Sequence, residues 1–254
     1  MPKQGKTINN LDVVQYLDSR KFTVLWSGGK DSTAVLLWVA NNIHHERWNI
    51  LFVEVTGNTH PLNIQYVHGV AKQLGVSHKL IHVGRNDLDF FEMMKKYGLP
   101  TFHKRWCLNR FKQPFFRQTH RIQVLGIRRS DGFRRRNMKL VEWFRSTDNI
   151  VVNPIVEWTK RRVIDYIRAH EISLNPCYRL FGHSGNCMFC PFHKAHSIIR
   201  TLNDPLFGKK IKQILLLVEA KNKSQLARDK YIKWRKHIGQ RLLVDFPFYD
   251  SEEV

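Results

Sequence analysis

The chain has 254 residues, of which 43% are hydrophobic and 25% are charged, a composition that excludes wholesale disorder and a disulfide-stapled mini-protein. Lys and Arg number 42 against 21 Asp and Glu, a formal net charge of +21, which predicts an acidic partner such as a nucleic acid or a phosphate-rich small molecule. The apolar runs are too short to cross a bilayer, and the polar first ten residues lack the apolar core of a signal peptide. We therefore expect a cytoplasmic protein without a membrane partner.

Short β-forming runs alternate with helical patterns through the first 156 residues. The spacing predicts helices at 11–20, 31–41, 60–75 and 88–97. Apolar runs predict strands at 22–26, 50–55, 79–83, 121–127 and 150–152. This alternation predicts an α/β fold with a doubly wound, mostly parallel sheet of five strands. Ligands of such sheets lie at the carboxyl ends of the strands.

The pattern changes after residue 156, which predicts two domains, an α/β domain at 1–156 and a smaller region at 157–254. In the second region, residues 157–170 predict an amphipathic helix and 175–191 an irregular loop rich in cysteine. Residues 191–240 predict a basic, entirely helical segment. Lys230, Lys233 and Lys236 with Trp234 could form one basic face of it.

A glycine-rich turn, Ser27-Gly28-Gly29-Lys30-Asp31-Ser32, follows the first predicted strand and opens a helix. Two glycines let the backbone curl around an anion, and the amides at the helix start and the Ser27 and Ser32 hydroxyls would then face it. Lys30 adds a mobile positive charge, and Asp31 could cap the helix or help to hold Mg²⁺. We therefore predict that this turn binds phosphate, with Lys30 and Asp31 as catalytic residues.

Two arginines, Arg128 and Arg129, follow the predicted strand at 121–127. They belong to the same end of a parallel sheet as the glycine-rich turn, and guanidinium groups bind phosphate or sulfate through two hydrogen bonds. The pair predicts a second contact to one polyphosphate or phosphosulfate ligand.

Four cysteines are present, Cys107, Cys177, Cys187 and Cys190, and the last two form a C-x-x-C between Gly185 and Pro191. Four thiolates can hold a tetrahedral zinc ion or a 4Fe–4S cluster. The alternatives include a mixed site with His103, His183, His193 or His196, a three-ligand cluster with one open iron, and buried or redox-active thiols without metal.

The glycine-rich turn resembles the pyrophosphate-binding loop of the adenine nucleotide alpha hydrolase superfamily, which includes ATP pyrophosphatases and the PAPS/APS reductases. Five further segments resemble the reductase branch, in order: TGNTHP from Thr56, GIRRSD from Gly126, NPI with Trp158-Thr159 from Asn153, and the two cysteine segments NPCY and GNCMFCP. The resemblance implies that Thr56, Gly126, Arg128 and Arg129 contribute to nucleotide binding. It departs from the family at Val55, where the reductases have Asp.

The cysteine pattern resembles cluster-bearing reductases and DNA phosphorothioation enzymes, so the resemblance favours a 4Fe–4S cluster over zinc. The reductases have an adjacent Cys-Cys pair where this chain has Cys107-Leu108, and they use a C-terminal cysteine as nucleophile, whereas no cysteine follows Cys190. We therefore expect an ATP-dependent adenylating sulfurtransferase, served by a sulfur donor. The alternatives are a PAPS or APS reductase with a thiol reductant, and a nucleic-acid-binding protein that is not an enzyme.

Residues 103–145 are rich in Lys and Arg, with aromatic residues interleaved. Such a segment could follow a phosphate backbone while its aromatic rings stack on unpaired bases. RNA or DNA is therefore a candidate substrate, although aromatic residues at this spacing more often belong to a core.

Overall fold

The computed structural model describes residues 10–101, 104–144, 148–219, 234 and 236–238. The chain forms two compact units, each built from separate stretches of sequence. Unit 1 contains Met1–Phe52, Val67–Val83 and Phe116–Leu174, and unit 2 contains Val53–Tyr66, Gly84–Phe115 and Asn175–Val254. The predicted domain boundary near residue 156 stays a prediction.

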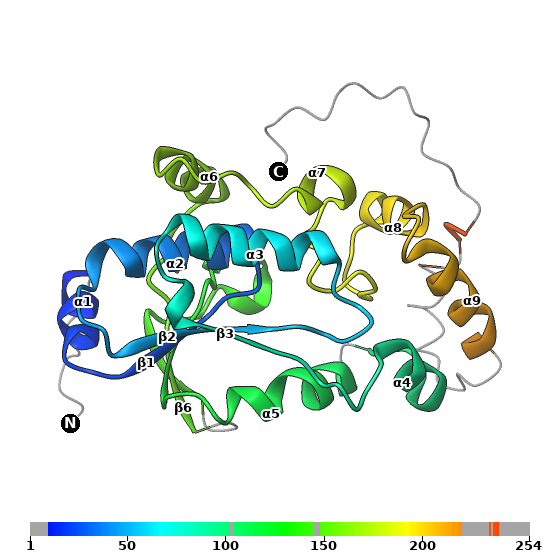
Figure 1. The fold of residues 1–254 in the computed structure, drawn as a ribbon, viewed down its shortest axis with the longest axis horizontal. Helices are drawn as coiled ribbons and strands as arrows, with labels where there is room; N and C mark the ends of the chain where they lie inside the picture. The colour runs from blue at the N-terminus through cyan, green and yellow to red at the C-terminus, as the bar shows by residue number, and fades with distance from the viewer. Residues whose placement is uncertain (1–9, 102–103, 145–147, 220–233, 235, 239–254) are drawn as a thin grey trace. The chain divides into compact units, whose positions relative to one another are not determined.

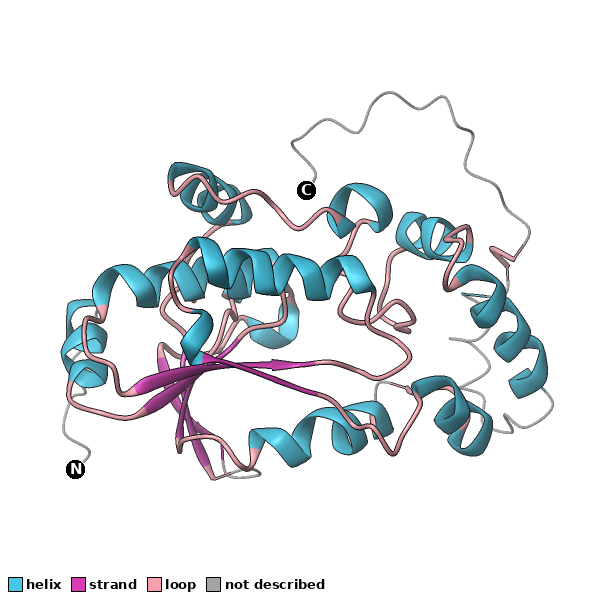
Figure 2. Ribbon diagram, in the orientation of Figure 1, coloured by secondary structure: helices cyan, strands magenta, loops and turns pink. Residues whose placement is uncertain are grey.

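Within the described residues, unit 1 is built on a six-stranded sheet with the order β3-β2-β1-β4-β6-β5 (Figure 2). Its strands are β1 (Phe22–Leu25), β2 (Trp48–Val53), β3 (Leu80–Val83), β4 (Ile122–Val124), β5 (Val141–Phe144) and β6 (Asn149–Val152). β1 pairs in parallel with both β2 and β4, and Val24 aligns with Ile50 and Val124. These three side chains are fully buried, as expected for a parallel sheet that is covered on both faces.

The predicted α/β class and mostly parallel sheet are confirmed, and the five predicted strands are all present. The sixth strand, β5, was not predicted. It pairs antiparallel with β6, with Val141 opposite Val152. β5 lies at the edge of the sheet and exposes Trp143, so its residues lack the continuous apolar run that marks the buried strands.

Helices α1 (Asn10–Asp18), α2 (Lys30–Asn42) and α6 (Lys160–Ala169) belong to unit 1. Every residue of α2 from Ser32 to Val39 is buried, which holds the start of this helix firmly against the sheet. α2 packs against α6, and Figure 1 shows both on the same side of the sheet. Helix α3 (Pro61–Gln73) begins in unit 2 and ends in unit 1, and the single turn η1 (Ser77–Lys79) precedes β3.

Unit 2 is mainly helical around an aromatic core. Its elements are α4 (Phe90–Tyr97), the π-helical turn η2 (Leu108–Lys112), α5 (Gln113–Phe116, whose last residue belongs to unit 1), α7 (Cys177–Phe181), α8 (Ala195–Leu202) and α9 (Gly208–Glu219). Phe90, Phe111 and Phe189 are fully buried in its core together with Trp234. The rings of Phe189 and Trp234 lie 4.4 Å apart, a separation typical of packed aromatic pairs.

The predicted helix at 191–240 is interrupted within the described residues. α8 ends at Leu202, and the carboxylate of Asp204 accepts hydrogen bonds from the amides of Leu206 and Phe207 before α9 begins. The basic face predicted around Lys230 and Lys233 lies outside the described residues. No helix in the described part of the chain has the length and apolarity that a membrane span needs.

Candidate functional site

The glycine-rich turn connects β1 to α2 in unit 1. Gly28 adopts a φ of +73°, in the left-handed region that favours glycine. Gly29 is the N-cap of α2 and provides no side-chain cap. An N-terminus without a side-chain cap presents backbone N–H groups and the positive end of the helix dipole, which together attract anions.

The Ser32 hydroxyl fixes the shape of the turn. It donates to the carbonyl of Gly29 at 2.9 Å and accepts from the amide of Ser27 at 3.3 Å. The Ser27 hydroxyl lies 3.2 Å away from it. These bonds close the turn on itself, so the predicted phosphate loop has a defined geometry without a ligand.

Gly126, just after β4, lies very close to this turn. A Cβ at Gly126 would lie 2.6 Å from the carbonyl carbon and oxygen of Asp31, and 2.7 Å from the nitrogen of Ser32. No side chain fits at that distance, so glycine is required for packing. This contact brings the two segments predicted to bind phosphate together.

Asp31 bridges two cations. One carboxylate oxygen lies 2.6 Å from the ammonium of Lys30, and the other lies 2.6 Å from Nε of Arg128. The predicted catalytic pair Lys30 and Asp31 is therefore in direct contact. Whether Asp31 also holds Mg²⁺ stays a prediction, since both of its oxygens face positive side chains here.

Arg128 is only 4% exposed. Its guanidinium forms an ion pair with Asp131 besides that with Asp31, and Nη1 donates to the Ser130 hydroxyl at 3.0 Å. Arg129 is more exposed, and its guanidinium forms an ion pair with Glu157 and donates to the carbonyl of Met138. Both predicted phosphate-binding arginines thus contact carboxylates, and direct phosphate binding by either stays a prediction.

The cysteines belong to unit 2, and the structure divides them. Burial raises the pKa of Cys190 to about 12, with smaller contributions from Cys187 and Cys107. Burial also raises the pKa of Cys107, and Cys187 adds to that rise. Cys107, Cys187 and Cys190 therefore lie within electrostatic reach of one another. We call these three residues the cysteine cluster.

Cys177 has different neighbours. Burial raises its pKa to about 12, with a further contribution from Asp204 rather than from another cysteine. Asp204 lies 3.6 Å from Nε2 of His60. The four cysteines predicted as one ligand set are thus placed as a group of three and a separate thiol beside an acidic residue.

The cysteines predicted as metal ligands do not form a ready metal site in the described residues. Thiolates suit zinc and iron–sulfur clusters, but no group of three or more His, Cys, Asp or Glu side chains within these residues could hold a metal ion. To bind one metal ion, the side chains of the cysteine cluster would have to move closer to one another.

Among the histidines predicted as alternative ligands, His183 has structural partners, and His103 lies outside the described residues. Burial lowers the pKa of His183 to about 4, with smaller contributions from His60 and His196. Nδ1 of His183 accepts from the amide of Gly185 at 3.1 Å, and Nε2 lies 3.0 Å from the Thr201 hydroxyl. A neutral ring with its proton on Nε2 satisfies both contacts.

The segment after β2 holds the loop that carries Cys187 and Cys190. The sequence did not indicate that Asn58 has this role. Its side chain donates to the carbonyl of Phe189 at 3.0 Å and accepts from the same residue's amide at 2.7 Å. The Thr59 hydroxyl donates to the carbonyl of Asn186 at 2.8 Å. Thr56, predicted to bind nucleotide, belongs to unit 2. Its backbone carbonyl accepts a hydrogen bond from the amide of Phe90 at 2.9 Å.

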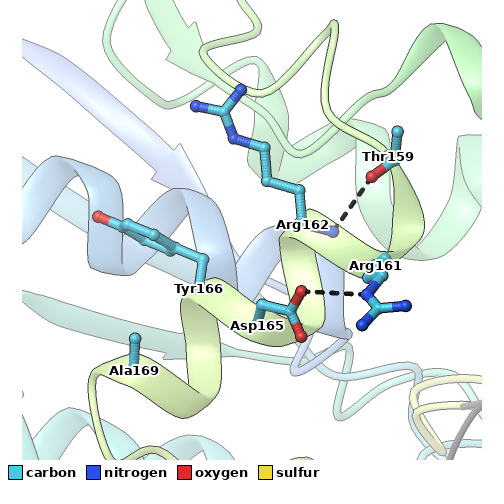
Figure 3. A pocket seen from close by; sticks show the side chains of 6 residues that line it. All are labelled: Thr159, Arg161, Arg162, Asp165, Tyr166 and Ala169. Carbon is cyan, nitrogen blue, oxygen red and sulfur yellow. Dashed lines mark hydrogen bonds and ion pairs between the residues drawn. The ribbon is translucent and has the colours of Figure 1, made fainter.

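An open hollow of about 480 Å³ lies along α6 (Figure 3). Its lining consists of Thr159, Arg161, Arg162, Asp165, Tyr166 and Ala169. Arg161 pairs with Asp165, and the amide of Arg162 donates to the Thr159 hydroxyl that caps the helix. None of the residues predicted to bind nucleotide lines this hollow.

Comparison with known proteins relates the chain to one enzyme domain. The sequence profile of the phosphoadenosine phosphosulfate reductase domain matches residues 21–191. Two uncharacterized proteins of Methanocaldococcus jannaschii are 28% and 27% identical over 179 and 192 residues, or 66% and 72% of this chain. The matched stretches are 35% and 45% of those proteins, so the chain spans less than half of their length.

Among solved structures, a phosphoadenylyl-sulfate reductase from Candida auris in a phosphate complex aligns with a TM-score of 0.51 at 17% identity. The alignment covers 68% of this chain and 85% of that chain. At this identity the similarity establishes the fold alone.

Proposed function

Because the chain belongs to the phosphoadenosine phosphosulfate reductase domain family, we propose that it binds ATP and adenylates an acidic acceptor ahead of sulfur transfer. The phosphates would lie on the turn Ser27–Ser32 and the first turn of α2. The observation that carries the proposal is that α2 begins without a side-chain cap behind a preformed glycine turn, with Lys30 anchored beside it. This arrangement suits a polyphosphate anion.

In the proposed step, an oxygen of the acceptor attacks the α-phosphorus of ATP. A bond forms between that oxygen and the α-phosphorus, the bond to the oxygen bridging the β-phosphorus breaks, and pyrophosphate leaves with the electron pair. The α2 amides and Lys30 stabilise the charge that builds on the pyrophosphate, and the Mg²⁺ that accompanies ATP neutralises part of it. A sulfur nucleophile from a donor then displaces AMP.

A PAPS or APS reductase is less well supported, because that reaction needs a thiolate as nucleophile. The pKa of Cys177 and that of Cys190 are both about 12, and the pKa of Cys107 is also raised. Thiols with such pKa values are protonated at neutral pH and attack poorly. ATP chemistry makes no such demand on these three cysteines.

One experiment separates these reactions. Anaerobically purified protein is given ATP, or PAPS with a thiol reductant, each with and without bulk tRNA, and pyrophosphate and sulfite are measured. Pyrophosphate from ATP that increases with the acceptor supports adenylation. Sulfite from PAPS supports the reductase. If neither product forms under any condition, the result contradicts an enzymatic role.

A nucleic-acid acceptor is favoured by one surface of unit 1. Phe133 is 74% exposed, and the guanidinium of Arg136 lies 3.7 Å from the centre of its ring. An exposed ring beside guanidinium groups can stack on an unpaired base while the cations contact phosphates. We propose single-stranded RNA or DNA as the acceptor.

Fluorescence anisotropy with labelled single-stranded RNA and DNA at several salt concentrations tests this acceptor. Phe133→Ala should weaken binding by about tenfold, since stacking contributes about 1–3 kcal/mol per base. Leu206→Ala is the matched control, because Leu206 is another exposed apolar side chain that belongs to unit 2. An equal effect of both substitutions would contradict the proposed surface.

A further inference from the structure

We propose that Arg128 and Asp131 are positioning residues, which hold Asp31 and through it orient Lys30 towards the phosphates of the nucleotide. The inference rests on the proposed function, because it concerns the same phosphate-binding turn. It assigns to Arg128 an indirect role, where the sequence motif alone predicts direct contact with phosphate.

The contacts form a continuous chain of alternating charge within unit 1. Lys30 pairs with Asp31, Asp31 with Arg128, and Arg128 with Asp131. Asp131 also accepts from the guanidinium of Arg135 at 2.8 Å and from the backbone amide of Arg128 at 3.3 Å. The carboxylate of Asp131 thus holds both the backbone amide and the guanidinium of Arg128.

The donors of Arg128 are largely committed to these partners. Nη2 donates to Asp131, and Nη1 donates to Ser130 at 3.0 Å and to the carbonyl of Trp158 at 3.4 Å. Nε lies 2.6 Å from a carboxylate oxygen of Asp31 in an ion pair that does not have hydrogen-bond geometry. The side chain is 4% exposed. A guanidinium in this state could bind a phosphate only by giving up Asp31 or Asp131, and the released carboxylate would remain largely buried without its cation.

The position of Asp31 is also fixed by its backbone. The close approach of Gly126 to its carbonyl group leaves the first turn of α2 little room to move. The carboxylate is therefore held by the helix on one side and by Arg128 on the other. Lys30, which pairs with that carboxylate at 2.6 Å, has its flexible side chain restricted where a pyrophosphate would bind.

This role predicts an effect opposite in sign to that of simple electrostatics. Removing the negative charge of Asp131 should strengthen anion binding if only charge mattered. If Asp131 acts by holding Arg128, its removal releases Asp31 and Lys30, and anion binding should weaken. The sign of the change in affinity therefore distinguishes positioning from charge.

The experiment is a calorimetric titration of pyrophosphate into the full chain, with Mg²⁺ and again with EDTA. Asp131→Asn should weaken pyrophosphate binding about tenfold, the size expected for loss of coupling through a network. Ser130→Ala leaves all charges in place and should weaken it about threefold, as for one lost hydrogen bond. Arg135→Gln removes only a half-exposed pair and should change it less than about twofold.

Thermal unfolding verifies that each variant is folded, and Ser130→Ala carries the test if Asp131→Asn does not fold. Unchanged or tighter binding by the folded variants overturns the positioning role, and so does an Arg135→Gln effect as large as that of Asp131→Asn. Asp31→Asn should weaken binding equally with Mg²⁺ and with EDTA. A loss confined to Mg²⁺ would make Asp31 a metal ligand and overturn the inference. Absence of binding by the wild-type protein would overturn the proposed function itself.

Discussion

The glycine-rich turn Ser27–Ser32, for which we propose phosphate binding, and the cysteine cluster differ in how their charges are arranged. In unit 1, charged side chains alternate in sign from Lys30 to Arg135 beside a helix N-terminus without a side-chain cap. In unit 2, burial raises the pKa of Cys107 and Cys190, which favours neutral thiols. The proposed function requires the first region to receive an anion, whereas the second must lose protons before it can bind a metal or attack a substrate.

The largest effect is expected at the turn itself. Lys30→Ala should lower pyrophosphate release from ATP by at least about 100-fold, since it removes a charge that stabilises the leaving group in the transition state. Pyrophosphate release at saturating ATP measures this. Lys21→Ala, at an exposed lysine just before β1, is the matched control and should leave the rate unchanged. A Lys30→Ala variant with the wild-type rate would show that Lys30 does not stabilise the leaving pyrophosphate.

The cysteine cluster makes a second prediction, on metal content. If Cys107, Cys187 and Cys190 bind a metal after deprotonation, Cys187→Ala should lose it, and Cys177→Ala, whose thiol lies beside Asp204, should keep it. Visible absorption and metal analysis of anaerobically purified variants measure the difference. Equal loss in both would mean that all four cysteines act together, against the division in this structure.

A third prediction concerns acid stability. The pKa of His183 is lowered to about 4 from 6.5 in the folded state, chiefly by burial. The unfolded chain therefore binds the proton first as the pH falls, and stability is lost between about pH 6.5 and 4, by up to about 3 kcal/mol. Urea unfolding at pH 4.5, 5.5 and 7.5 measures this loss. His183→Gln should reduce the loss of unfolding free energy between pH 7.5 and 4.5. His44→Gln, at an exposed histidine, should leave that loss unchanged. If His183→Gln lost as much stability at acid pH as the wild-type protein, the loss would belong to other titratable groups.

The smallest effect is a matched pair of glycine substitutions. Gly126→Ala places a Cβ 2.6 Å from the backbone of Asp31 and should destabilise the protein by about 1–3 kcal/mol. Gly69→Ala, in α3 with nothing within 4 Å of the new Cβ, should stabilise it by about 0.5–1 kcal/mol. Chemical denaturation measures both. Tolerance of Gly126→Ala would mean that the turn and the end of β4 are not as tightly packed as described.

The sequence predicts the sheet of unit 1 well, because its central strands are continuous apolar runs such as Phe22–Leu25 and Trp48–Val53. The family resemblance, drawn from the SGGKDS turn and the motifs that follow it, is confirmed by the profile match. The prediction fails where one side of an element is exposed, as in β5, and where a short helix interrupts an irregular segment, as in α7. Local patterns carry little signal for such elements.

The partners of the site residues could not be predicted from spacing. The ion pair between Asp31 and Arg128 joins residues far apart in sequence, and the hydrogen bonds of Asn58 to Phe189 do the same. Motifs indicate which residues matter, but whether an arginine faces a phosphate or a carboxylate depends on long-range packing. The same holds for Cys177, whose place beside Asp204 no C-x-x-C pattern indicates.

Hydrogen–deuterium exchange of the full chain with and without pyrophosphate tests whether the turn Ser27–Ser32 and the start of α2 bind an anion. Pyrophosphate should slow exchange of the amides from Gly28 to Ser32, because they would donate to the bound anion, whereas the amide of Thr33 already donates to the carbonyl of Gly29. Protection confined to the hollow along α6, or no protection from Gly28 to Ser32 at saturating pyrophosphate, would contradict anion binding by the turn.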